Sequence, residues 1–189
     1  MARLPMPRPI PTFAGRLVTL RPIDPAADAA AVFEWNKDPD LHRWTGTAVP
    51  ATADETRAEL ERLAAAPDSA TWTVVDNPSA KPAGVFTLFM ENRSGLLVVG
   101  EDVRFGKPFW RKGHHRQARY YLFRHAFETL GAVVYETATW GGNTNAVRAN
   151  EAYGFTLGGV ELSYHPKLET SMALRRYRMT REQWRGIYG

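Results

Sequence analysis

The chain has 189 residues, a length typical of one folded domain. Its 44% hydrophobic and 23% charged residues are ordinary for a globular protein, and it contains no apolar run of about 18 residues, the length that crosses a membrane. Cysteine is absent, which excludes disulfides, thiolate metal sites and a cysteine nucleophile and fits a cytoplasmic protein. The net charge of +4 favours anionic ligands, but the basic residues are scattered, which disfavours nucleic acid as a partner.

Residues 1–14 are predicted to form an extended arm. Prolines occupy positions 5, 7, 9 and 11, and alternating prolines favour an extended backbone. The segment also lacks the continuous apolar stretch of a secretory signal. Residues 15–189 show neither internal repeats nor a linker, so we expect them to form a single domain.

The first half of this domain combines two helices with an antiparallel meander. Asp24 followed by Pro25 is a helix start, and Thr52 with Glu55 is the signature of a capping box. Short, turn-rich connections separate the later strands, which predicts antiparallel pairing. The predicted elements are strands at 16–23, 71–76, 83–90 and 95–105 and helices at 25–38 and 52–66.

The second half is predicted to begin with the longest helix, inside residues 109–131. Ala118, Leu122, Ala126 and Leu130 form one apolar stripe, and Arg119 is expected mostly on another face. Further elements are strands at 132–140, from 155 and at 171–179, a helix at 143–153 and a helix-prone tail. The whole is a mixed α/β domain, and an exposed strand edge near the C-terminus would permit a homodimer.

A basic loop precedes the longest helix. The first turn of a helix exposes unpaired backbone N–H groups, and the helix dipole adds positive charge there. Arg111, Lys112 and Arg116 crowd the same end, where cations are normally disfavoured. A bound anion would offset their repulsion, although a solvated basic turn would also explain them.

The loop and a later segment together resemble a known family. Trp110, Lys112, Gly113 and Ala118 lead into "HAFETLG" at residues 125–131, and Asn143, Arg148, Glu151, Gly154 and Phe155 follow at matching spacing. In this pattern the chain resembles the GNAT superfamily of N-acetyltransferases from Gly15 onwards, most closely the ribosomal-protein N-terminal (Rim-type) group. The resemblance implies a GNAT-type α/β fold, a strongly twisted central sheet flanked by about four helices.

The resemblance also implies an activity and a cofactor site. It predicts direct transfer of the acetyl group of acetyl-CoA, without a metal, to a primary amine on a protein N-terminus or a small molecule. Backbone amides of the loop would hold the pyrophosphate, and the preceding strand, beside a splayed neighbour, would pair with the pantetheine arm. The implied cofactor-binding residues are Val103, Arg104, Phe105, Arg111, Lys112, Gly113, His114, His115, Arg116, Asn143 and Asn150.

Several positions depart from the family pattern. Arg111 and His115 replace small residues of the loop, and a ring at position 115 could block the approach of phosphate. Asn150 stands where many members have a tyrosine general acid, and Ala146 where Rim-type proteins have a serine. A degenerate domain that binds without catalysis therefore remains an alternative, as does an aminoglycoside-type acetyltransferase.

The sequence offers few clear candidates for a general acid or a general base. Glu101 is the best candidate for the base, although an exposed strand carboxylate is an equal interpretation, and Asp102 should face the opposite way. His114 and His115 are expected to titrate near neutrality. Cofactor affinity should then fall as salt rises and as the histidines lose protons.

The acceptor amine is expected near the early helices. In Rim-like proteins these helices and the loop between them border the acceptor site. Asp38 and Trp44 could bind an amine there, and Trp140 is a further candidate for substrate binding. Buried aromatic filler is the competing interpretation of either tryptophan.

Overall fold

The computed structural model describes residues 3–45 and 48–189. The strands are β1 (Arg3–Leu4), β2 (Phe13–Ala14), β3 (Val18–Pro22), β4 (Ser69–Asp76), β5 (Lys81–Arg93), β6 (Leu96–Phe105), β7 (Val134–Trp140), β8 (Thr156–His165) and β9 (Thr170–Thr180). The helices are α1 (Pro25–Asn36), α2 (Pro39–His42), α3 (Ala53–Ala65), α4 (His114–Arg124), α5 (Thr144–Ala152) and α6 (Arg181–Tyr188).

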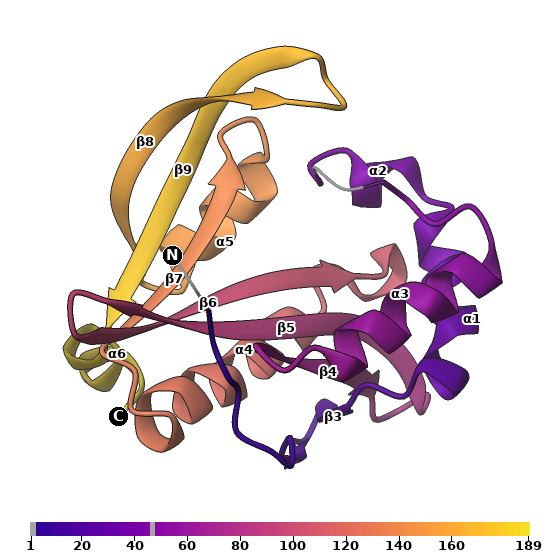
Figure 1. Ribbon diagram of the computed structural model, residues 1–189, viewed down its shortest axis with the longest axis horizontal. Coiled ribbons are helices and arrows are strands. Elements are labelled where there is room, and N and C mark those ends of the chain that lie inside the picture. The colour runs from indigo at the N-terminus through magenta and orange to yellow at the C-terminus, as the bar shows by residue number, and fades with distance from the viewer. Residues whose placement is uncertain (1–2, 46–47) are drawn as a thin grey trace.

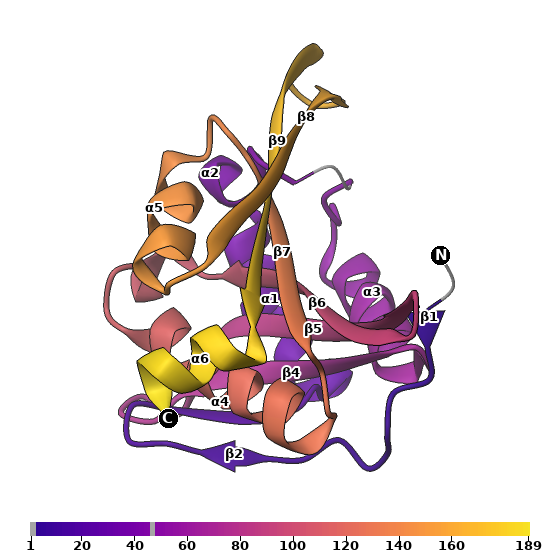
Figure 2. The same ribbon diagram turned by 90° about the vertical axis from the view of Figure 1, so that its left-hand side faces the viewer.

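In the described residues, nine strands form one twisted, mostly antiparallel sheet (Figures 1 and 2). Its order is β2-β3-β4-β5-β6-β7-β9-β8, with β1 added beside β5. The mixed α/β architecture and the antiparallel meander β4-β5-β6 confirm the sequence-based expectation.

No helix in the described part of the chain is long and apolar enough to cross a lipid bilayer.

Two predicted helices differ from expectation in length. The first ends at Asn36 because Asp38 starts a new helix, its carboxylate accepting a hydrogen bond from the Asp40 N–H at 2.9 Å. The longest helix leaves α-geometry after Arg124 and ends in a π-helical turn, His125–Thr129.

The proline-rich arm follows the surface of the domain in an extended conformation. Strand β1 pairs with β5, and strand β2 pairs with β3. Between them, the Met6 N–H donates to the Pro67 carbonyl at 2.8 Å, and Trp72 Nε1 donates to the Pro11 carbonyl at 2.7 Å. These strand pairings and hydrogen bonds hold residues 3–14 against the sheet.

The two faces of the sheet carry separate hydrophobic cores. The larger core joins the sheet to α4 and α6 through side chains such as Leu122, Phe123 and Trp184. The smaller core joins it to α1 and α3 through residues such as Val32 and Leu60. Because side chains alternate along a strand, neighbouring residues of β6 face opposite sides of the sheet.

The central feature is a fork between β6 and β7. These parallel strands pair only at Val98–Val134, Val99–Tyr135 and Gly100–Glu136. Beyond Gly100, β6 keeps β5 on one side as far as Phe105, while β7 continues with β9 as far as Trp140. In Figure 1, β7 climbs away from β6 together with β8 and β9. The splayed strand that the family resemblance implied is therefore present.

Candidate active site

The loop that leaves β6 presents free backbone amides. Trp110 anchors it, because Trp110 Nε1 donates to the Phe105 carbonyl at 2.6 Å. Residues 111–116, here called the amide loop, follow this anchor. Within the part of the chain that the structure describes, none of their N–H groups donates to a protein acceptor. Six such groups at one helix start make a site for an anion.

The backbone conformation of the amide loop is unusual at two positions. Arg111 has φ +60° and Gly113, the N-cap of α4, has φ +88°. Successive N–H groups around left-handed residues can point into one concavity that suits an anion. The Arg111, Lys112 and Arg116 side chains are exposed around it.

Replacement of Arg111 tests this conformation. A left-handed non-glycine residue costs about 1–2 kcal/mol, part of which glycine recovers. We expect Arg111→Gly to be more stable than Arg111→Ala by about 0.5–1 kcal/mol in urea unfolding. Both variants lose the guanidinium, so equal stabilities would argue against a left-handed Arg111.

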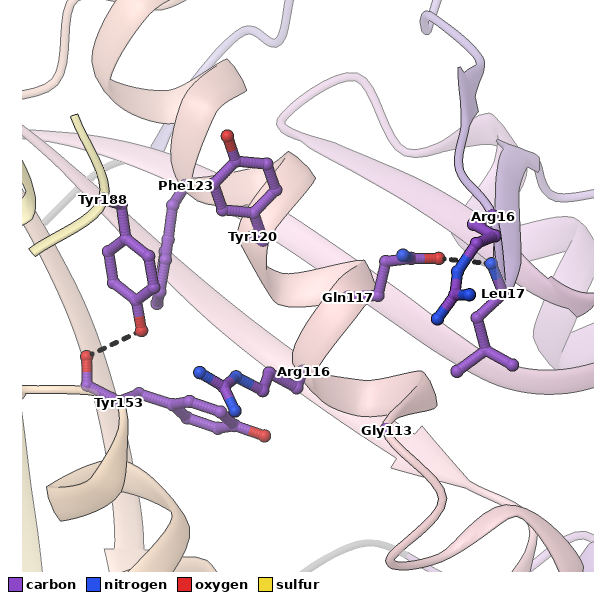
Figure 3. Close-up of a pocket in the computed structure, with 9 residues that line it drawn as sticks. All are labelled: Arg16, Leu17, Gly113, Arg116, Gln117, Tyr120, Phe123, Tyr153 and Tyr188. Atoms are coloured by element: carbon purple, nitrogen blue, oxygen red, sulfur yellow. Dashed lines mark hydrogen bonds between the residues drawn. The ribbon is translucent and has the colours of Figure 1, made fainter.

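A cavity of about 350 Å³ adjoins the amide loop. Figure 3 shows Gly113 at the start of α4, with Arg116, Gln117 and Tyr120 further along the helix. Gln117 holds this helix to the sheet edge, since its Oε1 accepts from the N–H groups of Leu17 and Val18 at 2.8 and 2.9 Å. Tyr153 and Tyr188 form the other wall.

His115 does not block the loop. Its ring stacks on Phe86 at 5.6 Å, meets Phe105 edge-on at 5.4 Å and bonds the Tyr153 hydroxyl through Nδ1 at 2.9 Å. Burial lowers the pKa of His115 to about 4. The expectation that this residue titrates near neutrality is therefore wrong, because the side chain turns into the core.

This burial predicts a pH dependence of stability. The folded-state pKa of about 4 lies below the ordinary 6.5, so the unfolded chain binds a proton that the folded chain refuses. Stability should be full above pH 6.5 and fall by up to roughly 3 kcal/mol as the pH drops towards 4. Urea unfolding of wild type and His115→Phe across this range measures the effect, and parallel pH curves would contradict it.

His114 is occupied beneath the loop. Its Nε2 lies 2.7 Å from Asp76 Oδ1, and both side chains are buried. Hydrogen bonds from Ser79 and His114 lower the pKa of Asp76, so the carboxylate is the acceptor and Nε2 carries the proton. Neither imidazole is thus positioned by the structure as a free cation on the loop.

Glu101 lies in a buried ion pair. Its side chain is 0% exposed, and Arg119 of α4 pairs with it through Nη2 and Nε. The Tyr135 hydroxyl donates to the same carboxylate at 2.7 Å. Burial lowers the pKa of Arg119 to about 10, which leaves it charged at neutral pH. A carboxylate held by these donors is poorly placed to accept a further proton.

The neighbouring carboxylate, Asp102, is exposed on the opposite face. It shares that face with Arg104, whose guanidinium pairs with Glu59 of α3 at 3.1 Å. Among the described residues, no cation pairs with Asp102, and β7 has already diverged from β6 at this point. The alternation of side chains along β6 correctly predicted that Glu101 and Asp102 face opposite sides of the sheet. Only the position of α4 in the structure shows that Asp102 is the exposed one.

The remaining cofactor candidates surround the fork. Val103 packs on the larger core and Phe105 is buried in it, so only their backbone groups line the free edge of β6. Asn143 caps α5 by accepting from the Ala146 N–H at 3.2 Å. Asn150 is buried, and its Oδ1 accepts from Arg119 Nη1 at 2.8 Å.

The expected acceptor residues separate into two groups. Trp44 and Trp140 meet at His165, with ring centroids 6.2 and 4.6 Å from the imidazole. The ring of Trp44 also covers Gly142, where a Cβ would lie 2.5 Å from it. Asp38 is elsewhere, capping α2 and pairing with Lys107 at 3.3 Å. Trp44 and Trp140 therefore lie together at the end of β7 that has separated from β6, and Asp38 is not beside them.

Comparison with known proteins identifies the family. The acetyltransferase (GNAT) domain model matches residues 17–156. A protein from T. thermophilus assigned as an acetyltransferase is 28% identical, with a TM-score of 0.81 over 96% of this chain and 95% of that chain. No curated protein matches the chain.

Two more distant structures share the fold. The ribosomal-protein-S5-alanine acetyltransferase of Vibrio fischeri is 17% identical, with a TM-score of 0.76 over 93% of this chain and 99% of that one. The spermidine N-acetyltransferase of Vibrio cholerae, solved with CoA and spermine, is 15% identical, with a TM-score of 0.76 over 89% and 98%. The family match, the fork and the free amides agree, and the chain belongs to the GNAT family of acetyl-CoA-dependent acetyltransferases.

Proposed function

We propose that the protein is a cytoplasmic N-acetyltransferase that moves the acetyl group of acetyl-CoA directly to a primary amine. The observation that carries this proposal is the amide loop, whose N–H groups have no protein acceptor among the described residues and adjoin the fork between β6 and β7. Three of the six N–H groups belong to the first turn of α4, as in any helix, and those of Arg111, Lys112 and Gly113 extend the unpaired donors into the preceding loop.

Each part of the site has a role toward acetyl-CoA. The amide loop would hold the diphosphate, with Arg111, Lys112 and Arg116 adding charge. The free edge of β6, from Val103 to Phe105, would pair with the pantetheine arm, and Asn143 would contact the same arm. The cofactor supplies an activated thioester, and backbone N–H groups of β6 would polarise its carbonyl.

Asp102 takes the role of general base in this proposal, in place of Glu101. An amine at neutral pH is mostly protonated and must lose a proton before it can attack. Asp102 is exposed on the face that carries Arg104 and α3, whereas Glu101 is enclosed by Arg119 and Tyr135. Asp102 can accept the proton directly or through a water molecule.

The charges around α2 and α3 favour a singly charged acceptor. Lys107 neutralises Asp38 and Asp40, at 3.3 and 2.7 Å, and Arg104 neutralises Glu59. A polyamine or aminoglycoside would need several free carboxylates. A peptide N-terminus needs only one base, for which Asp102 is proposed, and an apolar surface. Trp44 and Trp140 can provide that surface. We therefore favour an N-terminal amine over a polycation.

Two measurements test the proposal. Calorimetry should give micromolar affinity for acetyl-CoA, and release of free thiol should accompany acetylation of short peptides with free N-termini, with spermidine and kanamycin as competing acceptors. Acetylation confined to the polycations would overturn the choice of acceptor. Undetectable binding of acetyl-CoA would establish the non-catalytic alternative instead.

Salt should weaken binding of the cofactor. The side chains of Arg111, Lys112 and Arg116 are exposed, so these cations are screened as ionic strength rises. We expect the affinity for CoA to fall by about tenfold between 0.05 and 0.5 M NaCl. His115→Phe should keep the same salt dependence, because the neutral ring carries no charge at pH 7. Affinity independent of salt would contradict a diphosphate held at this loop.

A further inference from the structure

Strand β8 leaves one edge of the sheet open. Among the described residues it pairs only with β9, and it is the last strand in the sheet order. From Gly159 to His165 its register with β9 is unbroken, so its outer side presents a regular row of backbone N–H and C=O groups. Figures 1 and 2 show the β8–β9 hairpin rising beyond the rest of the domain. A free edge of this kind is a template for a further strand.

One face of β8 is apolar and exposed. Val160, Leu162 and Tyr164 alternate along the strand, so their side chains share a face. They are 57%, 79% and 59% exposed. Of the six exposed large hydrophobic residues in the part of the chain that the structure describes, four belong to this strand. Such a concentration on one strand is typical of a surface that another protein covers.

The edge also lacks the features that keep free strands apart. Native edges are commonly protected by charged side chains, prolines or bulges. Between Thr156 and His165 there is no proline, and Glu161 is the only acidic or basic residue besides the histidine. Arg176 neutralises Glu161 at 2.7 Å. The bulge that follows Leu157 affects only the start of the strand, so Val160–Tyr164 is left unprotected.

We propose that β8 pairs antiparallel with β8 of a second copy of the chain, about a twofold axis at Leu162. This register sets the two Leu162 side chains opposite each other and Val160 opposite the partner's Tyr164. It also sets Glu161 opposite the partner's Ser163. The apolar faces of the two copies then form one continuous patch, and the two sheets join into one. The proposal does not depend on the acetyltransferase activity.

Neighbouring registers are less favourable. An axis at Glu161 would place the two Glu161 carboxylates directly opposite each other, and like charges in that position are destabilising. An axis at Ser163 would move Val160 past the end of the partner strand, opposite Pro166. An axis between two residues would set the apolar face of one copy against the opposite face of the other. Only an axis at Leu162 keeps both the apolar match and the separation of charge.

The matched side chains favour a second copy over an extended peptide. A peptide of unrelated sequence could form the backbone hydrogen bonds, but it would not supply apolar residues at the three positions opposite Val160, Leu162 and Tyr164. An interface of one strand from each copy is small, and small interfaces are typical of weak complexes. We therefore expect a dissociation constant of roughly 1–100 μM.

Sedimentation over a range of protein concentrations tests the dimer. The average mass of wild type should rise from that of one chain towards that of two between about 1 and 200 μM. Leu162→Lys brings two ammonium groups together at the axis and should weaken association by at least about 30-fold. Leu162 is so exposed that the substitution should leave the fold and the affinity for acetyl-CoA unchanged. Leu96→Lys, an exposed leucine on another strand, is the control and should dimerise as wild type.

Cross-linking tests the register, and the absence of cysteine makes it specific. Opposite residues of an antiparallel pair have Cα atoms about 4.5–5.5 Å apart, within the range of a disulfide. Leu162→Cys should therefore form a cross-linked dimer under mild oxidation. In the same register two copies of residue 157 lie roughly 30 Å apart. Leu157→Cys, exposed on the same strand, should cross-link at least about tenfold more slowly.

Three results would overturn the proposal. They are a wild type that stays monomeric throughout the concentration range, a dimer that Leu162→Lys leaves intact, and equal cross-linking rates for Leu157→Cys and Leu162→Cys. A monomer that instead binds extended peptides along β8 would assign the edge to a peptide. Should Leu162→Lys fail to fold, the two cysteine variants decide the question. Failure to bind acetyl-CoA would overturn the proposed function and leave the dimer standing.

Discussion

Replacement of Arg119 by methionine is expected to destabilise the fold by about 3–5 kcal/mol. The substitution leaves the Glu101 carboxylate, whose side chain is 0% exposed, without its cation. The Tyr135 hydroxyl remains as a donor, but one neutral hydrogen bond does not replace the charge. The same change removes the donor to Asn150 and the contacts with the rings of Tyr153 and Phe155. Urea unfolding monitored by tryptophan fluorescence measures the loss.

A double variant separates the buried charge from the lost packing. Glu101→Gln combined with Arg119→Met removes both charges, and it should recover most of the stability lost by the single change. Arg124→Met, on the exposed face of the same helix, is the matched control and should cost less than about 0.5 kcal/mol. A single variant no less stable than the double variant would show that Glu101 does not depend on Arg119.

Asp102→Asn is expected to lower kcat/KM for the amine by about 10²–10⁴-fold. The amide keeps the size of the side chain but cannot take a proton from the ammonium form of the acceptor. Affinity for acetyl-CoA, measured by calorimetry, should remain within a factor of about three because binding uses backbone groups of β6 and the amide loop. The acidic limb of the pH–rate profile should also move.

The control for this variant is another exposed carboxylate, Asp40. Asp40 pairs with Lys107 and is assigned no part in the chemistry. Asp40→Asn should therefore change kcat/KM by less than about threefold. If Asp102→Asn turned over substrate as fast as wild type, Asp102 would not be the general base. Glu101 would then be the first alternative to test.

The sequence predicted the elements well because their signals are local. Asp24 and Thr52 cap α1 and α3 as expected, and the apolar stripe from Ala118 marked the buried face of α4. Arg119 was expected off this stripe. It is buried beside the stripe, because α4 packs against both β6 and α5 there and so buries a wider face. An arginine flanked by Ala118 and Leu122 was the signal for a buried carboxylate partner.

The conformations of the site residues depend on contacts distant in the sequence. His115 turns inward because its ring packs against Phe86 of β5 and Phe105 of β6, and no local pattern reveals that these two rings lie beside it. Strand alternation separated Glu101 from Asp102, but strand order and the position of α4 were needed to show which carboxylate is enclosed. In the same way, His165 meets Trp44 only through the β8–β9 hairpin.

The amide loop can be tested most directly by amide NMR. Titration of ¹⁵N-labelled protein with CoA should move the backbone resonances of residues 111–116 further than any others, and inorganic pyrophosphate should move the same set. Binding of CoA that leaves these six resonances in place would contradict the account, because the diphosphate would then be held elsewhere.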